Sequence, residues 1–186
     1  ERVNLFPPTV TAVTALFVGA GGVVSQNFYS AGGKAGANKT PDYIAFTFSS
    51  PIDPNTLNGD SVLLEALGVT ANNAPGSRIS LAGKTSYDPA NHILYVSLGA
   101  SGTVLPTDAY RFILVGSGAS VIANQQGIAL DGENLTNNNN PNTGVQLPLP
   151  SGNGQPGGNF YNNFIINTVA SDIVAGSFRL SPSSDS

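Results

Sequence analysis

The 186-residue sequence predicts an all-β fold in which short strands build a sandwich. Segments rich in β-branched and aromatic residues recur roughly every 8–12 residues, the spacing of strands in such folds. The segments between them are rich in Gly, Pro, Asn and Asp, the residue types that favour turns. No stretch shows the longer apolar period of an amphipathic helix, so strands and turns account for the pattern.

The first two predicted strands enclose a segment of weaker signal. Residues 9–18 are β-branched and mildly alternating, and they predict the first strand. Residues 42–48 form the clearest strand, because apolar side chains at every second position place one face in the core. Residues 19–39, rich in Gly, Ala, Ser and Asn, predict a long loop or a decorated hairpin with a short strand near residues 26–29.

Turn chemistry marks the middle of the chain. Pro51 and Pro54 end the strand before them, and Asp53 is predicted to cap a single helical turn over residues 53–56. Residues 84–87 and 92–98 flank the sequence Asp-Pro-Ala-Asn at 88–91, which has the composition of a type I turn. These segments therefore predict a hairpin.

The other elements follow the same reasoning. Further strands are predicted at residues 61–66, 78–81, 110–115, 119–123 and 160–168. Residues 124–127 predict a turn, and residues 137–158 a long polar loop rich in Pro and Gly. The sandwich is thus expected to span residues 9–168, between an N-terminal arm at 1–8 and a C-terminal tail or linker at 169–186 in which residues 172–180 are again β-prone.

Composition excludes several classes of function. Charged residues make up only 10% of the chain and the net charge is −4, so neither nucleic acid nor an anionic membrane surface is an expected partner. No run of about 18 apolar residues predicts insertion into a membrane. The absence of cysteine excludes disulfides, thiolate metal sites and a cysteine nucleophile.

No catalytic or cofactor-binding residues are predicted. His92 is the single histidine, and no Gly-x-Ser-x-Gly motif accompanies it. The glycine-rich stretches at 19–24 and 152–157 lack the strand–turn–helix context of a nucleotide site.

One cluster of oxygen ligands stands out. Asp131, Glu133 and Asn134 lie close together beside an Asn-rich loop, and calcium prefers carboxylate, amide and carbonyl oxygens. The alternative is a turn whose Asn side chains bind their own backbone. Asn38 and Asn134 also begin the two Asn-x-Thr sequons of the chain, which are candidate glycosylation sites.

Five segments, in this order, resemble bacterial Ig-like domains of the surface-layer-protein type. They are YIAFTFSSPIDPNT at 43–56, SVLL at 61–64, YDP with ILYV at 87–96, LP with YRFILV at 105–115, and GIALDGE at 127–133. The resemblance covers residues 8–168. It implies an Ig-like antiparallel sandwich of about seven to nine strands. It also implies an extracellular or cell-surface location and a structural or adhesive role without catalysis.

The two arms carry the main functional hypothesis. Ig-like sandwiches have open sheet edges, to which an extended apolar segment can add as a further strand. The expected interface residues are Val3, Leu5, Phe6, Ile173, Val174 and Phe178. The chain is therefore expected to self-assemble with other copies, or to join neighbouring Ig-like domains, as a filament or surface layer. The arms could instead pack on their own domain or serve as short linkers.

Two other functions remain open from the sequence. A glycan-binding or adhesive module would stack sugar rings on exposed aromatic side chains such as Tyr29, Tyr43 or Tyr161. The chain could also be an accessory domain of a larger secreted enzyme.

Overall fold

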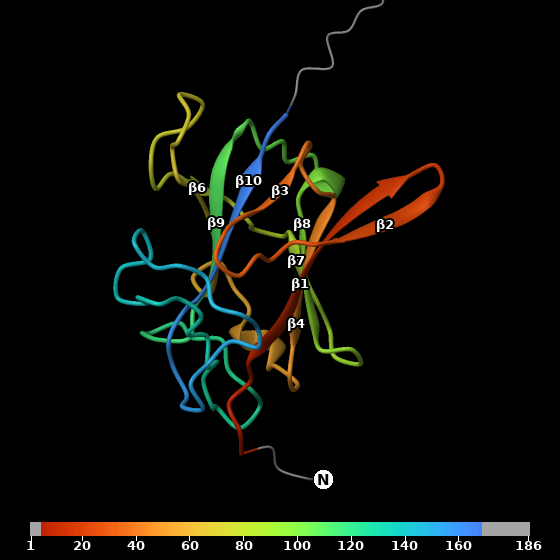
Figure 1. Cartoon of the computed structure of the whole chain (residues 1–186). Coiled ribbons are helices and arrows are strands. Elements are labelled where there is room, and N and C mark those ends of the chain that lie inside the picture. The colour runs from red at the N-terminus through yellow and green to blue at the C-terminus, as the bar shows by residue number, and fades with distance from the viewer. Residues whose placement is uncertain (1–4, 169–186) are drawn as a thin grey trace, which may run out of the picture.

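Two five-stranded sheets pack face to face in the computed structural model, which describes residues 5–168 (Figure 1). The first sheet has the order β2 (Gly22–Asn27), β1 (Val10–Gly19), β4 (Tyr43–Phe48), β8 (Ile93–Ser97) and β7 (Thr85–Asp88). The second has the order β3 (Ala35–Ala37), β10 (Phe160–Ile166), β9 (Asp108–Leu114), β5 (Val62–Ala66) and β6 (Arg78–Ile79). Neighbouring strands are antiparallel except β3 and β10, which are parallel. The predicted all-β sandwich is confirmed.

Aromatic side chains fill the space between the sheets. Phe46 of β4 packs edge-on against Phe112 of β9, with ring centroids 5.2 Å apart. Phe112 in turn stacks on Phe164 of β10 at 5.6 Å, and Phe160 lies on the other side of Phe46. All four side chains are fully buried, so this cluster joins the central strands of both sheets.

The strands with strong apolar alternation lie where the sequence predicts them. β1, β4, β5, β8, β9 and β10 differ from the predicted bounds by at most a few residues at either end. The turns also match. Asp53 accepts a hydrogen bond from the Asn55 N–H ahead of a short 3-10 helix, η1 (Pro54–Thr56), and the Asp88 carboxylate accepts the Ala90 N–H within the β7–β8 hairpin.

The decorated hairpin, one of the two alternatives for residues 19–39, is present: β1 continues into β2 through a tight turn at Ala20 and Gly21, and β3 follows. Another expectation needs correction. The predicted strand at 119–123 does not form, and Ala123 makes only an isolated bridge to Ala129. The physical reason is that the Ile122 N–H turns back to the Val115 carbonyl while the Ile122 side chain is buried in the core.

The connection between β9 and β10 is the longest irregular segment among the described residues. Its backbone bridges the two sheets, because the Asp131 N–H donates to the Pro8 carbonyl and the Ser151 N–H to the Val10 carbonyl, at the entry to β1. Pro8 is buried, so the last residue of the predicted arm belongs to the packed body.

Removing one ring of the aromatic cluster is expected to cost a large part of the free energy of unfolding. Phe112→Ala should lower the free energy of unfolding by about 3–5 kcal/mol, because it leaves a cavity between two rings that do not collapse onto each other. Urea unfolding followed by circular dichroism measures this. As a control, Val104→Ala, at a side chain 77% exposed, should change it by less than about 0.5 kcal/mol. Equal losses in both variants would contradict this account of the core.

Candidate functional site

The predicted calcium ligands lie in the β9–β10 connection. The Asp131 side chain is buried, and its two oxygens accept the N–H groups of Asn153 at 3.0 Å and Gly154 at 2.7 Å. Gly152 has φ +101°, and a Cβ there would collide with the Asp131 carboxylate. The Glu133 carboxylate accepts a hydrogen bond from the Asn153 amide. These carboxylates therefore hold a turn of the connection around themselves.

Asn134 is placed differently from the two carboxylates. Its Oδ1 accepts the Tyr161 N–H at 2.9 Å, and its Nδ2 donates to the Tyr161 carbonyl at 2.7 Å and to the Tyr29 hydroxyl at 3.0 Å. One side-chain amide thus pairs with both backbone groups of a strand residue. Asn134 is 1% exposed, so its oxygen is not turned toward a metal and its nitrogen is not accessible to a glycan. In this structure the Asn134 amide serves the backbone of β10.

Gln146 binds the backbone of β10 two residues further along the strand, at Asn163. Its Oε1 accepts the Asn163 N–H at 2.6 Å, while its Nε2 donates to the carbonyls of Ser30 at 2.8 Å and Gly33 at 3.1 Å. β3 pairs with β10 only at residues 164–166. The two side-chain amides therefore continue the role of β3 along the rest of this edge.

A buried cation fastens the same connection to the second sheet. Arg111 of β9 is 4% exposed; its Nε donates to Asn163 Oδ1 at 2.8 Å and its Nη2 to the Pro141 carbonyl at 2.9 Å. Its Nη1 reaches Asn142 at 3.0 Å and Glu65 at 3.4 Å. Burial lowers the pKa of the guanidinium from its usual value, and the Glu65 carboxylate opposes that change.

In this structure the side chains of Asp131, Glu133 and Asn134 bind groups of the protein itself. Among residues 5–168, no three or more His, Asp or Glu side chains come together in a group that could hold a metal ion. Asn38, the other sequon, is exposed just after β3 and remains accessible.

The aromatic side chains proposed for sugar stacking separate into two groups. Tyr29 and Tyr161 are each 7% exposed and are therefore closed to a ligand, which corrects that expectation. Burial raises the pKa of Tyr29, although the Asn134 amide that binds its hydroxyl acts in the opposite direction. Only Tyr43 stays accessible, on the outer face of the first sheet.

Tyr43 lines an apolar groove of about 280 Å³ on that outer face. Its lining residues are Leu16, Val18, Val23, Tyr43, Ser86 and Tyr95. No charged side chain is among them. The sequence signal for Tyr95 was present, since it alternates with Leu94 and Val96, which point into the core. The alternation of apolar and polar residues predicts that Tyr95 lies on the outer face, but it does not predict that this face forms a groove.

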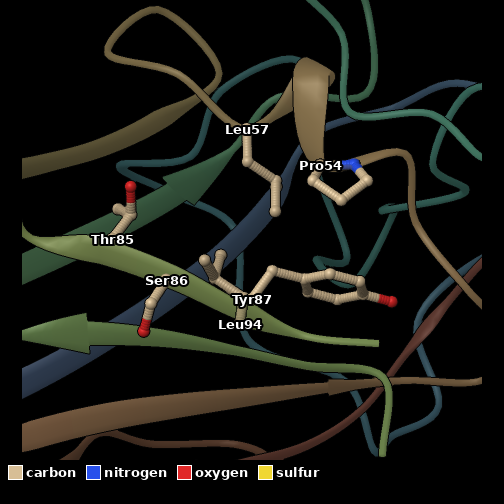
Figure 2. A pocket seen from close by; sticks show the side chains of 6 residues that line it. All are labelled: Pro54, Leu57, Thr85, Ser86, Tyr87 and Leu94. Carbon is tan, nitrogen blue, oxygen red and sulfur yellow. The ribbon is translucent and has the colours of Figure 1, made fainter. Parts of the chain in front are cut away.

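A smaller pocket of about 170 Å³ lies between η1 and the edge strand β7 (Figure 2). Pro54 and Leu57 lie on one side of it, and Thr85, Ser86 and Tyr87 on the other. The Tyr87 hydroxyl accepts the Ile52 N–H at 2.8 Å, and burial raises its pKa. The remaining lining groups are apolar or hydroxyl, so the pocket carries no pair of acid and base.

Among the sheet edges formed by residues 5–168, that of β2 is the least protected. All six of its residues are exposed, and its sequence Gly-Val-Val-Ser-Gln-Asn holds neither charge nor proline. Val23 and Val24 are 63% and 66% exposed. Charge, proline and short length are the usual means by which an edge avoids pairing with another chain. β2 has none of these.

Parts of the predicted assembly interface lie beyond the described residues. Val3, Ile173, Val174 and Phe178 are outside them, whereas Leu5 and Phe6 are 72% and 79% exposed. No helix among residues 5–168 is long and apolar enough to span a membrane.

Comparison with known proteins gives no relative. No protein-family model, no curated protein and no solved structure matches the chain.

Asn134 is expected to be the most important polar side chain of the connection. Asn134→Ala should lower the free energy of unfolding by about 2–4 kcal/mol, because it leaves the buried N–H and carbonyl of Tyr161 without their side-chain partner. The Tyr29 hydroxyl loses the amide but keeps its bond to the Leu147 carbonyl. Thermal and urea unfolding measure the loss. The matched control is Asn38→Ala, an exposed asparagine in the other sequon, which should change stability by less than about 0.5 kcal/mol. If Asn134→Ala leaves the free energy of unfolding unchanged, Asn134 does not stabilise the edge of β10.

Proposed function

We propose that the chain is an Ig-like structural subunit or repeat of a bacterial extracellular surface assembly, a filament or a layer, whose partners are further copies of itself. The strand order supports the Ig-like assignment. Strands β1, β4, β8 and β7 follow the A-B-E-D order of that fold, and β10, β9, β5 and β6 follow the order G-F-C-C′. In this comparison β2 and β3 are additions to the common pattern.

The observation that carries the proposal is the placement of the two chain ends. The described chain enters β1 from one end of the sandwich, and β10, its last strand, ends at the opposite end (Figure 1). The exit is anchored, because the Thr168 and Thr107 hydroxyls lie 2.7 Å apart. Contacts made through opposite ends join copies head to tail, and such contacts produce an open filament when they do not close into a ring.

The chemistry of the arms supports the same proposal. Leu5 is 72% exposed, and residues 172–180 carry apolar side chains at Ile173, Val174 and Phe178. Extended segments of this kind bind sheet edges through backbone hydrogen bonds, while pockets for alternate side chains give specificity. The low fraction of charged residues, 10%, limits repulsion between identical copies.

The groove beside Tyr43 and Tyr95 favours one alternative. Two tyrosines on an open face are the side chains on which sugar rings stack, so a glycan-binding or adhesive module is the second candidate. The polar groups of the groove are the hydroxyls of Tyr43, Tyr95 and Ser86. That set offers a sugar few hydrogen bonds, which makes this function the weaker proposal. A glycan array with no signal would count against it.

Truncation tests the assembly. The full chain is expected to form filaments or sheets in negative-stain micrographs, and a chain ending at Thr168 or beginning at Pro7 should remain monomeric in analytical ultracentrifugation. Pro8 is kept because its carbonyl accepts the Asp131 N–H. Near-ultraviolet circular dichroism checks that each shortened chain is folded. Normal polymers from both folded, shortened chains would refute assembly through the arms.

A further inference from the structure

We propose that the free edge of β2, with the apolar groove beside it, is the acceptor for residues 172–180 of a neighbouring copy. This inference rests on the proposed function and names the acceptor of the C-terminal arm. The neighbour's segment would add to the first sheet as a sixth strand.

The hydrogen bonds of β1 define which backbone groups of β2 are free. The Leu16 carbonyl accepts the Asp42 N–H at 2.9 Å, and the Val18 N–H donates to Asp42 Oδ2 at 2.7 Å, so the backbone of both residues faces β4. Leu16 lies opposite Ser25, and Val18 lies opposite Val23. Hydrogen-bonded and non-hydrogen-bonded pairs alternate in an antiparallel ladder. The N–H and C=O groups of Val23 and Ser25 therefore point away from β1, toward the open edge.

The other edges are less suited to accept a strand. β6 is two residues long, and its Arg78 pairs with Glu65 at 3.7 Å. β7 is four residues long and ends at Asp88. β3 is three residues long, and its Gly36 carbonyl already accepts a hydrogen bond from the Gln26 amide. Short length and charge protect these edges, whereas β2 has six residues and neither protection.

The side chains beside β2 add an apolar surface to the backbone edge. Val18 and Val23 are cross-strand partners, 52% and 63% exposed, on the face that also carries Tyr43 and Tyr95. A strand paired with β2 would place every second side chain on this face, with Val23 as its first neighbour. The site therefore selects a segment with apolar residues at alternate positions.

Residues 172–180 have that pattern. In an extended segment Val174, Phe178 and Leu180 share one face, with Gly176 between them. Asp172 and Arg179 are the only charged residues of the segment, and β2 carries no charge. The segment is also longer than β2, so it can pair along the whole edge. These features fit the chain's own C-terminal segment as the occupant, and the proposed assembly assigns that segment to a second copy.

Cysteine cross-linking gives a direct test, because the chain contains no cysteine. Full-length Ser25→Cys is mixed with Val174→Cys, Gly176→Cys or Phe178→Cys and oxidised. Ser25→Cys is expected to form a disulfide-linked heterodimer with at least one of the three. As the control, Ser80→Cys, at an exposed serine beside β6, replaces Ser25→Cys in the same mixtures and should form none. Three other results would overturn the proposal. One is no heterodimer with any of the three. Another is a disulfide-linked dimer of two Ser25→Cys chains instead, which would indicate pairing of two β2 edges. The third is an intramolecular disulfide as the main product of a chain carrying both cysteines.

Substitution of the edge separates this site from assembly in general. Ser25→Pro removes one outward N–H and leaves the ladder to β1 in place, so it should reduce polymer yield by about tenfold. Ser25→Ala should have no effect. Val23→Lys provides a second test that keeps the backbone unchanged, and it should reduce the yield as well. If folded Ser25→Pro and Val23→Lys chains polymerise normally, β2 is not the acceptor although assembly stands. If the unmodified chain forms no polymer, the proposed function itself fails.

Discussion

The outer edge of β10, which β3 covers only in part, is the constraint on which the rest of this fold depends. β10 is a central strand of the core, yet β3 covers only residues 164–166 of its outer edge. The backbone groups of Tyr161 and Asn163 lie further along that edge and are buried. A buried, unpaired backbone group costs about as much as a lost hydrogen bond, so this edge needs partners. Asn134 and Gln146 supply them from the β9–β10 connection.

The position of the connection determines which surfaces stay open. With Arg111 fastening it and Leu135 packing on Ile113 and Tyr161, the connection covers the outer face of the second sheet. All seven residues of β9 are buried as a result. Among residues 5–168 no comparable connection covers the first sheet, and its outer face keeps the groove beside Tyr43. The two outer faces of this sandwich are therefore unequal in the part of the chain that the structure describes.

An element could be predicted from the sequence when its own buried side chains stabilise it, and could not when a distant segment does. β5 and β8 bury alternate side chains, and this local pattern predicted both strands. β2 buries none of its six residues and is held by its ladder to β1, so its Gly and Ser content left both a loop and a hairpin open. The part that Asn134 plays in the fold could not be predicted for a related reason. Its partner Tyr29 lies 105 residues away, and an amide that completes a distant strand has the same local sequence as a metal ligand or a sequon.

The edges of β10 and β2 are treated differently, and the difference bears on the proposed assembly. Polar residues are abundant here, and at β10 two of them are used to cap a strand edge that would otherwise lack partners. Within the described residues, β2 also has an edge without a strand partner, and it contains two amide side chains, Gln26 and Asn27. The Gln26 amide, however, donates to the Gly36 carbonyl in β3 and does not cap the edge of β2. An edge that serves no purpose is readily closed by one lysine or proline. The absence of either from all six residues of β2, next to an uncharged groove, is what a strand-accepting surface requires.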